Sequence, residues 1–250
     1  MTFRLSTDGP RTAMLLAAGE GRRMMPLTAD CPKPLLKVGG QAMLDRSLDR
    51  LQEVGVEKVI VNACYLGDQI AAHLAPRQQP VVEIIHEKTP LETGGGVKGA
   101  LPLLGAAGFF VINGDSLWVD GIKNTLQRVA AAWDDATMDV LLLMQPLARV
   151  FGSVQRGDYM MSPDGRLTRR AERQVAGFCY IGVSILHPRL FADCPAGAFS
   201  LNVLYDRAEA AGRLFGIAHD GLWYHVSRPE DLAHANGMFA RGHEPETPYF

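Results

Sequence analysis

Apolar runs alternate with helically spaced apolar residues over the first 150 positions of the chain. Short runs such as residues 109–113 (FFVIN) are typical of strands buried on both faces. Residues 44–54 instead carry an apolar residue at every third or fourth position, which indicates one face of a helix that Gly55 ends. The pattern predicts strands over residues 13–17, 58–62, 81–86, 109–113 and 139–144, a short extended piece over 34–38, and helices over 44–54, 66–74, 97–104 and 122–132.

This alternation predicts an α/β fold of the Rossmann-like kind, with a mostly parallel sheet sandwiched by helices and right-handed crossovers. Ligands of such sheets bind beyond the carboxyl ends of the strands. The loops that follow residues 17, 86 and 113 lie on that edge, and they are the loops with unusual residues. We therefore expect the functional site there.

After residue 150 the pattern changes to short segments between tight turns, at 151–154 and 157–160 and around Asp164-Gly165, which favours small antiparallel strands. The chain then predicts a long strand over 177–186, extended segments over 214–218 and 223–226, and helices over 202–211 and 229–240. We interpret the chain as a single domain over residues 1–250. It has two parts, 12–150 and 151–240, and loose tails at 1–10 and 241–250.

Composition narrows the class of protein. Hydrophobic residues make up 47% and charged residues 21%, as in ordinary globular proteins. A net charge of -2 predicts no attraction to nucleic acid or to an acidic membrane. The four cysteines form no CxxC pair, so we expect neither disulfides nor structural zinc. The first residues lack the apolar core of a signal peptide, and no run reaches transmembrane length, so we expect a cytoplasmic protein.

The loop after the first strand carries the strongest chemical signal. It contains Gly19 and Gly21, the pair Arg22-Arg23, and Lys33 between two prolines. Glycines let backbone N–H groups approach anionic oxygens, and the cations supply charge, so the loop suits a polyphosphate. The alternative is a surface loop with solvated charges. The dinucleotide fingerprint fails at Met24, where a third glycine is needed, and no Gly-Lys-Ser/Thr of a P-loop is present.

Residues 16–35, LAAGEGRRMMPLTADCPKPL, resemble the signature of the sugar-1-phosphate nucleotidyltransferases, L-A-A-G-x-G-x-R-[LM]-x-P-L-T followed by P-K-P-L. The resemblance runs through most of the chain and thins after about residue 150. It implies the nucleotide-diphospho-sugar transferase type of fold, in which residues 12–150 bind the nucleotide and residues 151–240 bind the sugar phosphate. It also implies the reaction of an NTP with a sugar 1-phosphate to give an NDP-sugar and pyrophosphate.

The resemblance assigns catalytic roles to Arg23, Lys33 and Asp115. Arg23 matches the motif arginine, while Arg22 is expected to face solvent. The prolines beside Lys33 stiffen the backbone and aim the ammonium. Asp115, in Asn113-Gly114-Asp115, matches the family's metal aspartate and suits Mg²⁺, which prefers oxygen ligands. A solvated lysine and a turn-capping aspartate are the alternatives.

The nucleotide is expected to contact two glycine-rich segments. By the resemblance, one follows the first strand and the other, residues 92–96, precedes the predicted helix 97–104. Backbone N–H groups of the second segment would face a base or a phosphate, unless it is a flexible connection. The expected nucleotide-binding residues are Ala17, Ala18, Gly19, Gly21, Thr93, Gly94 and Gly95.

The acceptor side resembles the family less closely. The segment Phe151-Gly152-Ser153-Val154 is similar to the family's Tyr-Gly-Val-Val, and Glu172-Arg173 is similar to its Glu-Lys, although Gln174 replaces the usual proline. The resemblance implies sugar contacts from Gly152 and Glu172 and a phosphate contact from Arg173. Asn202 is a further candidate for the sugar. Turns and surface ion pairs are equally good explanations of these residues.

His225 departs from the family pattern. It stands where Trp-x-Asp-x-Gly-Thr has an aspartate that binds a second metal ion. Imidazole is a poorer Mg²⁺ ligand than carboxylate. His225 could contact a phosphate, accept another metal or mark the loss of the ligand, and the alternative is a packed histidine.

The substrates follow only from the resemblance. The compact length and the segment PLETGGG (90–96) are most similar to N-acetylmuramate-1-phosphate uridylyltransferases of cell-wall recycling, which implies UTP as the donor. Mannose-1-phosphate guanylyltransferases are the alternative. A non-catalytic regulator that binds nucleotide or sugar phosphate is an alternative of another class, supported by His225 and opposed by the intact catalytic residues. The oligomeric state is left open.

Overall fold

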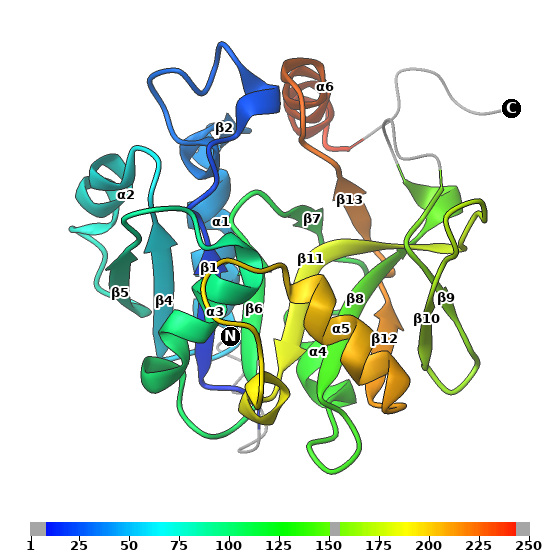
Figure 1. Ribbon diagram of the computed structural model, residues 1–250. Coiled ribbons are helices and arrows are strands. Elements are labelled where there is room, and N and C mark those ends of the chain that lie inside the picture. The colour runs from blue at the N-terminus through cyan, green and yellow to red at the C-terminus, as the bar shows by residue number, and fades with distance from the viewer. Residues whose placement is uncertain (1–8, 151–155, 244–250) are drawn as a thin grey trace, which may run out of the picture.

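The computed structural model describes residues 9–150 and 156–243 (Figure 1). A twisted central sheet has the strand order β10-β9-β11-β6-β1-β4-β5, and β8 and β12 continue it beside β11. The strands are β1 (Thr12–Leu16), β4 (Lys58–Ala63), β5 (Val81–His86), β6 (Phe109–Asn113), β8 (Val140–Pro146), β9 (Tyr159–Met161), β10 (Leu167–Arg169), β11 (Phe178–Leu186) and β12 (Leu214–Ala218). The predicted parallel core is confirmed in β6, β1, β4 and β5. The long strand β11 runs antiparallel to β6 and β8.

Helices cover both faces of the sheet, as the sequence predicts (Figure 1). In β1, Ala13 and Leu15 face one layer and Met14 faces the other, and all three are fully buried. The first layer holds α1 (Met43–Glu53), α2 (Gly67–Leu74) and α4 (Thr125–Ala132), and the second holds α3 (Glu92–Leu104) and α5 (Leu201–Ala210). A strand buried on both faces needs apolar side chains on both, which explains the continuous apolar runs.

A third core joins the two ends of the chain. The helix α6 (Pro229–Ala240) packs beside β2 (Lys37–Val38), which pairs with β3 (Gln41–Ala42). Its apolar side chains share this core with β7 (Leu117–Val119) and β13 (Leu222–Tyr224). Met24, in the 3₁₀ turn Arg22–Met24, is fully buried there with Leu117, Tyr224 and Met238. The bounds of α6 match the prediction. The pairing of β7 with β13 was not predicted, because strands of three residues separated by about 100 positions leave no periodic signal.

Three predicted bounds need correction. The helix predicted over 122–132 begins at Thr125. The helix predicted over 97–104 begins at Glu92, so its glycines lie inside the first turns. Residues 33–35 form a 3₁₀ turn in which Leu35 N–H donates to the Pro32 carbonyl at 2.9 Å, and the extended segment is shorter than predicted. The segment predicted over 151–154 lies outside the described residues. In the described part of the chain, no helix is long and apolar enough to cross a membrane.

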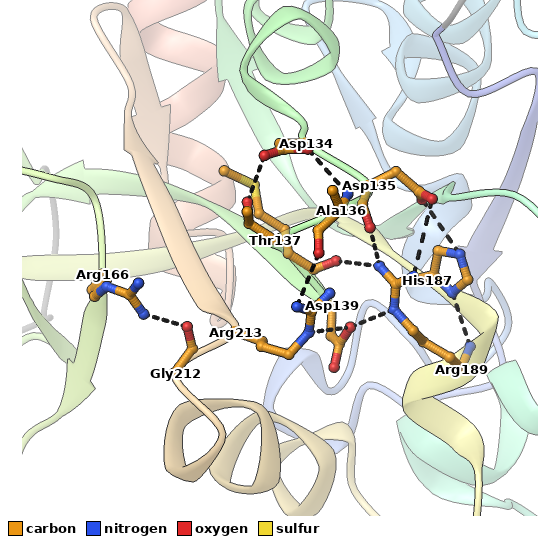
Figure 2. A network of polar contacts seen from close by, with 11 residues as sticks. Asp134, Asp135, Ala136, Thr137, Asp139, Arg166, His187, Arg189, Gly212 and Arg213 are labelled. Atoms are coloured by element: carbon orange, nitrogen blue, oxygen red, sulfur yellow. Dashed lines mark hydrogen bonds and ion pairs between the residues drawn. The ribbon is translucent and has the colours of Figure 1, made fainter.

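A polar network connects the segments before β8, after β11 and before β12, at the end of the sheet opposite the predicted site (Figure 2). Asp139, at the start of β8, accepts hydrogen bonds from Arg189 Nε at 2.6 Å and Arg213 Nε at 2.8 Å. Arg213 also donates to the Ala136 carbonyl at 3.0 Å, which connects this loop to the start of β12. Burial raises the pKa of Asp139, but the hydrogen bonds and charges of the two arginines outweigh burial, so its pKa lies below the ordinary aspartate value.

We predict that Asp139→Asn lowers the free energy of unfolding at pH 7 by about 1–2 kcal/mol, because two partly exposed guanidinium groups lose their charged partner. A depressed carboxyl pKa stabilises the fold above the unfolded pKa, and this stabilisation is lost as the pH falls below about 4. The difference between wild type and variant in urea unfolding should therefore shrink between about pH 5 and pH 3.

The matched control is Glu57→Gln, because Glu57 pairs with Arg11 on the exposed surface. We expect a change within about 0.5 kcal/mol for this variant. Equal losses for both variants would contradict a special role for the Asp139 network.

Candidate active site

The loops after β1 and β6 meet at the carboxyl edge of the sheet. Leu16 pairs with Asn113, and Gly114 N–H donates to the Leu16 carbonyl at 2.9 Å. A Cβ at position 114 would lie 2.8 Å from that oxygen, so glycine permits the close approach. The next residue is Asp115, which is thereby placed against the loop that follows β1.

Lys33 and Asp115 form an ion pair at this edge. The Lys33 side chain is 10% exposed, while that of Asp115 is 39% exposed. A buried ammonium is costly without an anionic partner, so the Asp115 carboxylate stabilises Lys33 in this position. The 3₁₀ turn Lys33–Leu35 and its prolines hold the backbone of the lysine, as the sequence predicts.

A cavity of about 400 Å³ opens beside this ion pair. Its walls come from the loops after β1, β5 and β6, which are the three loops that the sequence places on one edge. Arg23 lines the cavity, and Arg22 borders it with a side chain that is 83% exposed and paired with Glu20. The structure brings together eight predicted site residues around this cavity: Ala17, Ala18, Gly19, Gly21, Arg23, Lys33, Thr93 and Asp115.

A second cavity, of about 280 Å³, adjoins the first and shares Arg23, Asn113 and Asp115 with it. Its other wall is an irregular stretch of β11 around Gly182, whose φ is +80°. Ser116 Oγ donates to the Ile181 carbonyl at 2.9 Å, and a Cβ at position 182 would lie 2.2 Å from that hydroxyl. Glycine at 182 therefore lets β11 approach the end of β6.

His225 lines the second cavity together with Asp115. Its ring lies 5.3 Å from the Trp223 ring, between centroids. Burial lowers the pKa of His225, and Lys33 and Arg23 lower it further, against the opposing charges of Asp231 and Asp115. An imidazole can donate N–H to a phosphate oxygen, and its neutral form can instead bind a metal through the unprotonated nitrogen. Within the described ranges, no three His, Cys, Asp or Glu side chains gather to hold a metal ion.

The family model described as nucleotidyl transferase matches residues 12–173, about two thirds of the chain. The chain belongs to the nucleotidyl transferase family. It is 43% identical over 239 residues to an N-acetylmuramate alpha-1-phosphate uridylyltransferase of Caulobacter vibrioides, with 94% of this chain and 99% of the relative covered. It is 34% identical over 230 residues to the enzyme of that name from Neisseria meningitidis, with 90% and 97% covered.

A solved structure has the same fold. It is HddC from Yersinia pseudotuberculosis complexed with GMP-PN, at a TM-score of 0.72 and 24% identity over 92% of this chain and 99% of that one. The likeness confirms the arrangement of sheet and helices for this nucleotidyltransferase.

A buried hydrogen-bond network around the Asn62 side chain stabilises the wall of the enzyme's first cavity. The sequence analysis did not predict it. Asn62, 2% exposed at the end of β4, accepts from Ala17 N–H at 2.9 Å and donates to Glu87 Oε1 at 2.7 Å. Glu87 Oε2 accepts from Leu91 N–H at 3.0 Å, just before α3. One asparagine thus connects the loops after β1 and β5. The signal in the sequence is a polar residue that ends the apolar run KVIVN.

The glycines at the start of α3 pack closely against the segment before α5. The N–H groups of Gly94 and Gly95 donate to the Phe199 carbonyl at 2.8 and 3.2 Å, and neither glycine lines the cavity. A Cβ at position 94 would lie 2.3 Å from the Phe199 ring. These two N–H groups are therefore paired within the protein, and close packing against the segment before α5 requires glycine at position 94. Nucleotide binding by Gly94 and Gly95 stays a prediction.

The three predicted acceptor residues that the structure describes lie outside both cavities. Glu172 and Arg173 are exposed in a turn after β10, and Arg170 Nη1 donates to the Glu172 carbonyl at 3.1 Å. Asn202 is exposed in the first turn of α5. Gly152 lies outside the described residues. The roles of these four residues in binding the sugar phosphate stay predictions.

We predict that Asn62→Ala lowers the free energy of unfolding by about 2 kcal/mol, because it leaves the buried Ala17 N–H and one Glu87 oxygen without their partner. It should also raise KM for the nucleotide, since Ala17 lies on the cavity wall. Urea unfolding and initial rates measure the two effects. Asn202→Ala, at an exposed site, is the stability control and should change unfolding by less than about 0.5 kcal/mol. Equal stability of the two variants would contradict the structural role of Asn62.

Proposed function

We propose that the enzyme transfers a uridylyl group from UTP to N-acetylmuramate 1-phosphate, forming the UDP-sugar and releasing pyrophosphate. The observation that carries the proposal is the position of Arg23 and Asp115, which line both cavities. A donor in the first cavity and an acceptor in the second would meet at these residues. The two relatives named uridylyltransferases, each matched over nearly its whole length, support this choice of substrates. Such a reaction belongs to the recycling of peptidoglycan in the cytoplasm.

The reaction needs charge stabilisation more than a general base. A phosphate monoester has a second pKa near ~6, so the attacking oxygen is largely dianionic at neutral pH. It would attack the α-phosphorus in line with the departing pyrophosphate. Repulsion between the anions and the charge that develops on pyrophosphate are the obstacles, and Arg23 and Lys33 offset both. The glycine-rich loop after β1 allows a close approach of the phosphate chain.

The residues present fit a magnesium ion held by few protein ligands. Asp115 is partly exposed at the boundary of the two cavities and supplies a carboxylate. Mg²⁺ is commonly bound by one or two carboxylates together with substrate phosphates and water. When bound, it would neutralise charge on the phosphates. We propose Asp115 as its main ligand and His225 as a neighbour that faces the same cavity. Lys33, already paired with Asp115, would keep the carboxylate oriented between the cavities.

We predict release of pyrophosphate when the protein, Mg²⁺, UTP and N-acetylmuramate 1-phosphate are combined, and a loss of about 10²–10³ in kcat for Asp115→Asn and for Lys33→Ala. The measurement is a coupled pyrophosphate assay across the four NTPs and a panel of sugar 1-phosphates that includes mannose and glucose. Asp164→Asn, on an exposed turn, is the matched control and should keep the wild-type rate.

The other outcomes identify the alternatives. Release with GTP and mannose 1-phosphate alone would replace the proposed substrates by those of a guanylyltransferase. Nucleotide binding without release across the whole panel, with Mn²⁺ as well as Mg²⁺, would indicate a non-catalytic regulator.

A further inference from the structure

Glu92, on the wall of the first cavity, has an unusual backbone conformation. It is the first residue of α3, and its φ is +56°, in the left-handed region that favours glycine. Leu66, Asp193 and His243 are the other described non-glycine residues with positive φ, and none of them lines either cavity. Non-glycine residues whose backbone is held in this region lower the stability of the fold, and they are found disproportionately at functional sites.

The carboxylate of Glu92 has no structural partner among the described residues. Glu92 is exposed, and its neighbours Leu91 and Thr93 make the local connections: the Leu91 carbonyl accepts from Phe199 N–H at 3.2 Å, and Thr93 Oγ1 accepts from Leu201 N–H at 2.9 Å. An acidic residue in the first turn interacts favourably with the helix dipole. That interaction does not require a left-handed backbone, so it leaves the conformation unexplained.

The chemistry of the cavity limits what Glu92 can bind. Arg23 and Lys33 come from the loop after β1 and attract phosphates, whereas Glu92 lies at the start of α3 and would repel them. An ionised carboxylate only accepts hydrogen bonds, so its partner must be a donor. The donors that a nucleoside triphosphate offers at pH 7 are the N–H groups of the base and the hydroxyl groups of the ribose.

We propose that Glu92 is a specificity-determining residue that accepts a hydrogen bond from the nucleoside of the NTP, through a base N–H or a ribose hydroxyl. The proposal rests on the proposed nucleotidyl transfer. The family resemblance implies nucleotide contacts from the backbone and glycines of this segment, and the proposal adds a contact from the Glu92 side chain. Because the nucleoside end carries no net charge, a carboxylate there distinguishes nucleotides by their donors and keeps the triphosphate directed toward Arg23.

The test compares Glu92→Gly and Glu92→Gln with a matched control. Glycine accepts the positive φ without strain, so Glu92→Gly keeps the backbone path and removes only the side chain. Glutamine keeps an acceptor oxygen but loses the charge. Asp193→Gly removes a carboxylate from another exposed positive-φ position, away from both cavities, and controls for the change of backbone freedom.

We expect Glu92→Gly to lower kcat/KM for UTP by about tenfold or more, the size expected for a lost hydrogen bond to a charged group, and Glu92→Gln to lower it less. Asp193→Gly should leave it unchanged. Three analogues of UTP locate the donor: 2′-deoxy-UTP, 3′-deoxy-UTP and the triphosphate of 3-methyluridine. The analogue that lacks the bonded donor should give the same kcat/KM with wild type and with Glu92→Gly, while the other two analogues keep the full difference.

Two results would overturn the proposal: an unchanged kcat/KM in Glu92→Gly, or the same loss for UTP and for all three analogues. The first would leave the carboxylate without a role in nucleotide recognition. The second would mean that the carboxylate acts on a part that all these nucleotides share, such as the triphosphate. These results are distinct from a failure of the proposed function, in which the wild type itself releases no pyrophosphate. In that case, calorimetric titration of the same variants with UTP and the three analogues tests Glu92 by affinity alone.

Discussion

The parallel pairing of β1 with β6 is the constraint on which the site depends. It brings the Leu16 carbonyl to the Gly114 N–H at 2.9 Å, and the loops that leave the two strands then emerge side by side. Asp115 follows on one loop, and Arg23 and Lys33 follow on the other. Because parallel strands present their carboxyl ends at one edge, residues about 80 to 90 positions apart become neighbours without further adjustment.

The ion pair with Asp115 holds the positive charge of Lys33 at the site where an anionic substrate would bind. A lysine whose side chain is only 10% exposed would be costly alone, and the aspartate compensates for the lost hydration. The same exclusion of water strengthens the attraction of the site for phosphate oxygens. The pair stands where the two cavities meet, so the groups that screen the repulsion between donor and acceptor need little rearrangement.

The C-terminal segment completes the site from a distance of about 200 residues in the sequence. It contributes His225 and Ser227 to the cavity walls, and α6 buries Met24 of the signature loop. Asp231 accepts hydrogen bonds from Ser227 N–H and Arg228 N–H at 2.9 and 2.8 Å, which fixes the start of α6. The position of Arg23 therefore depends on packing contributed by both ends of the chain.

The sequence by itself determined the α/β class, most element bounds and the gathering of Arg23, Lys33 and Asp115, because apolar periodicity and a dense local motif are encoded over few residues. Only the tertiary structure decided which polar groups already have hydrogen-bond partners within the protein. The N–H groups of Gly94 and Gly95 donate to the Phe199 carbonyl, Asn62 connects two loops, and the Glu92 side chain on the cavity wall has no partner among the described residues. These roles depend on contacts between segments that are far apart in the sequence, and such contacts leave no pattern in one chain read alone.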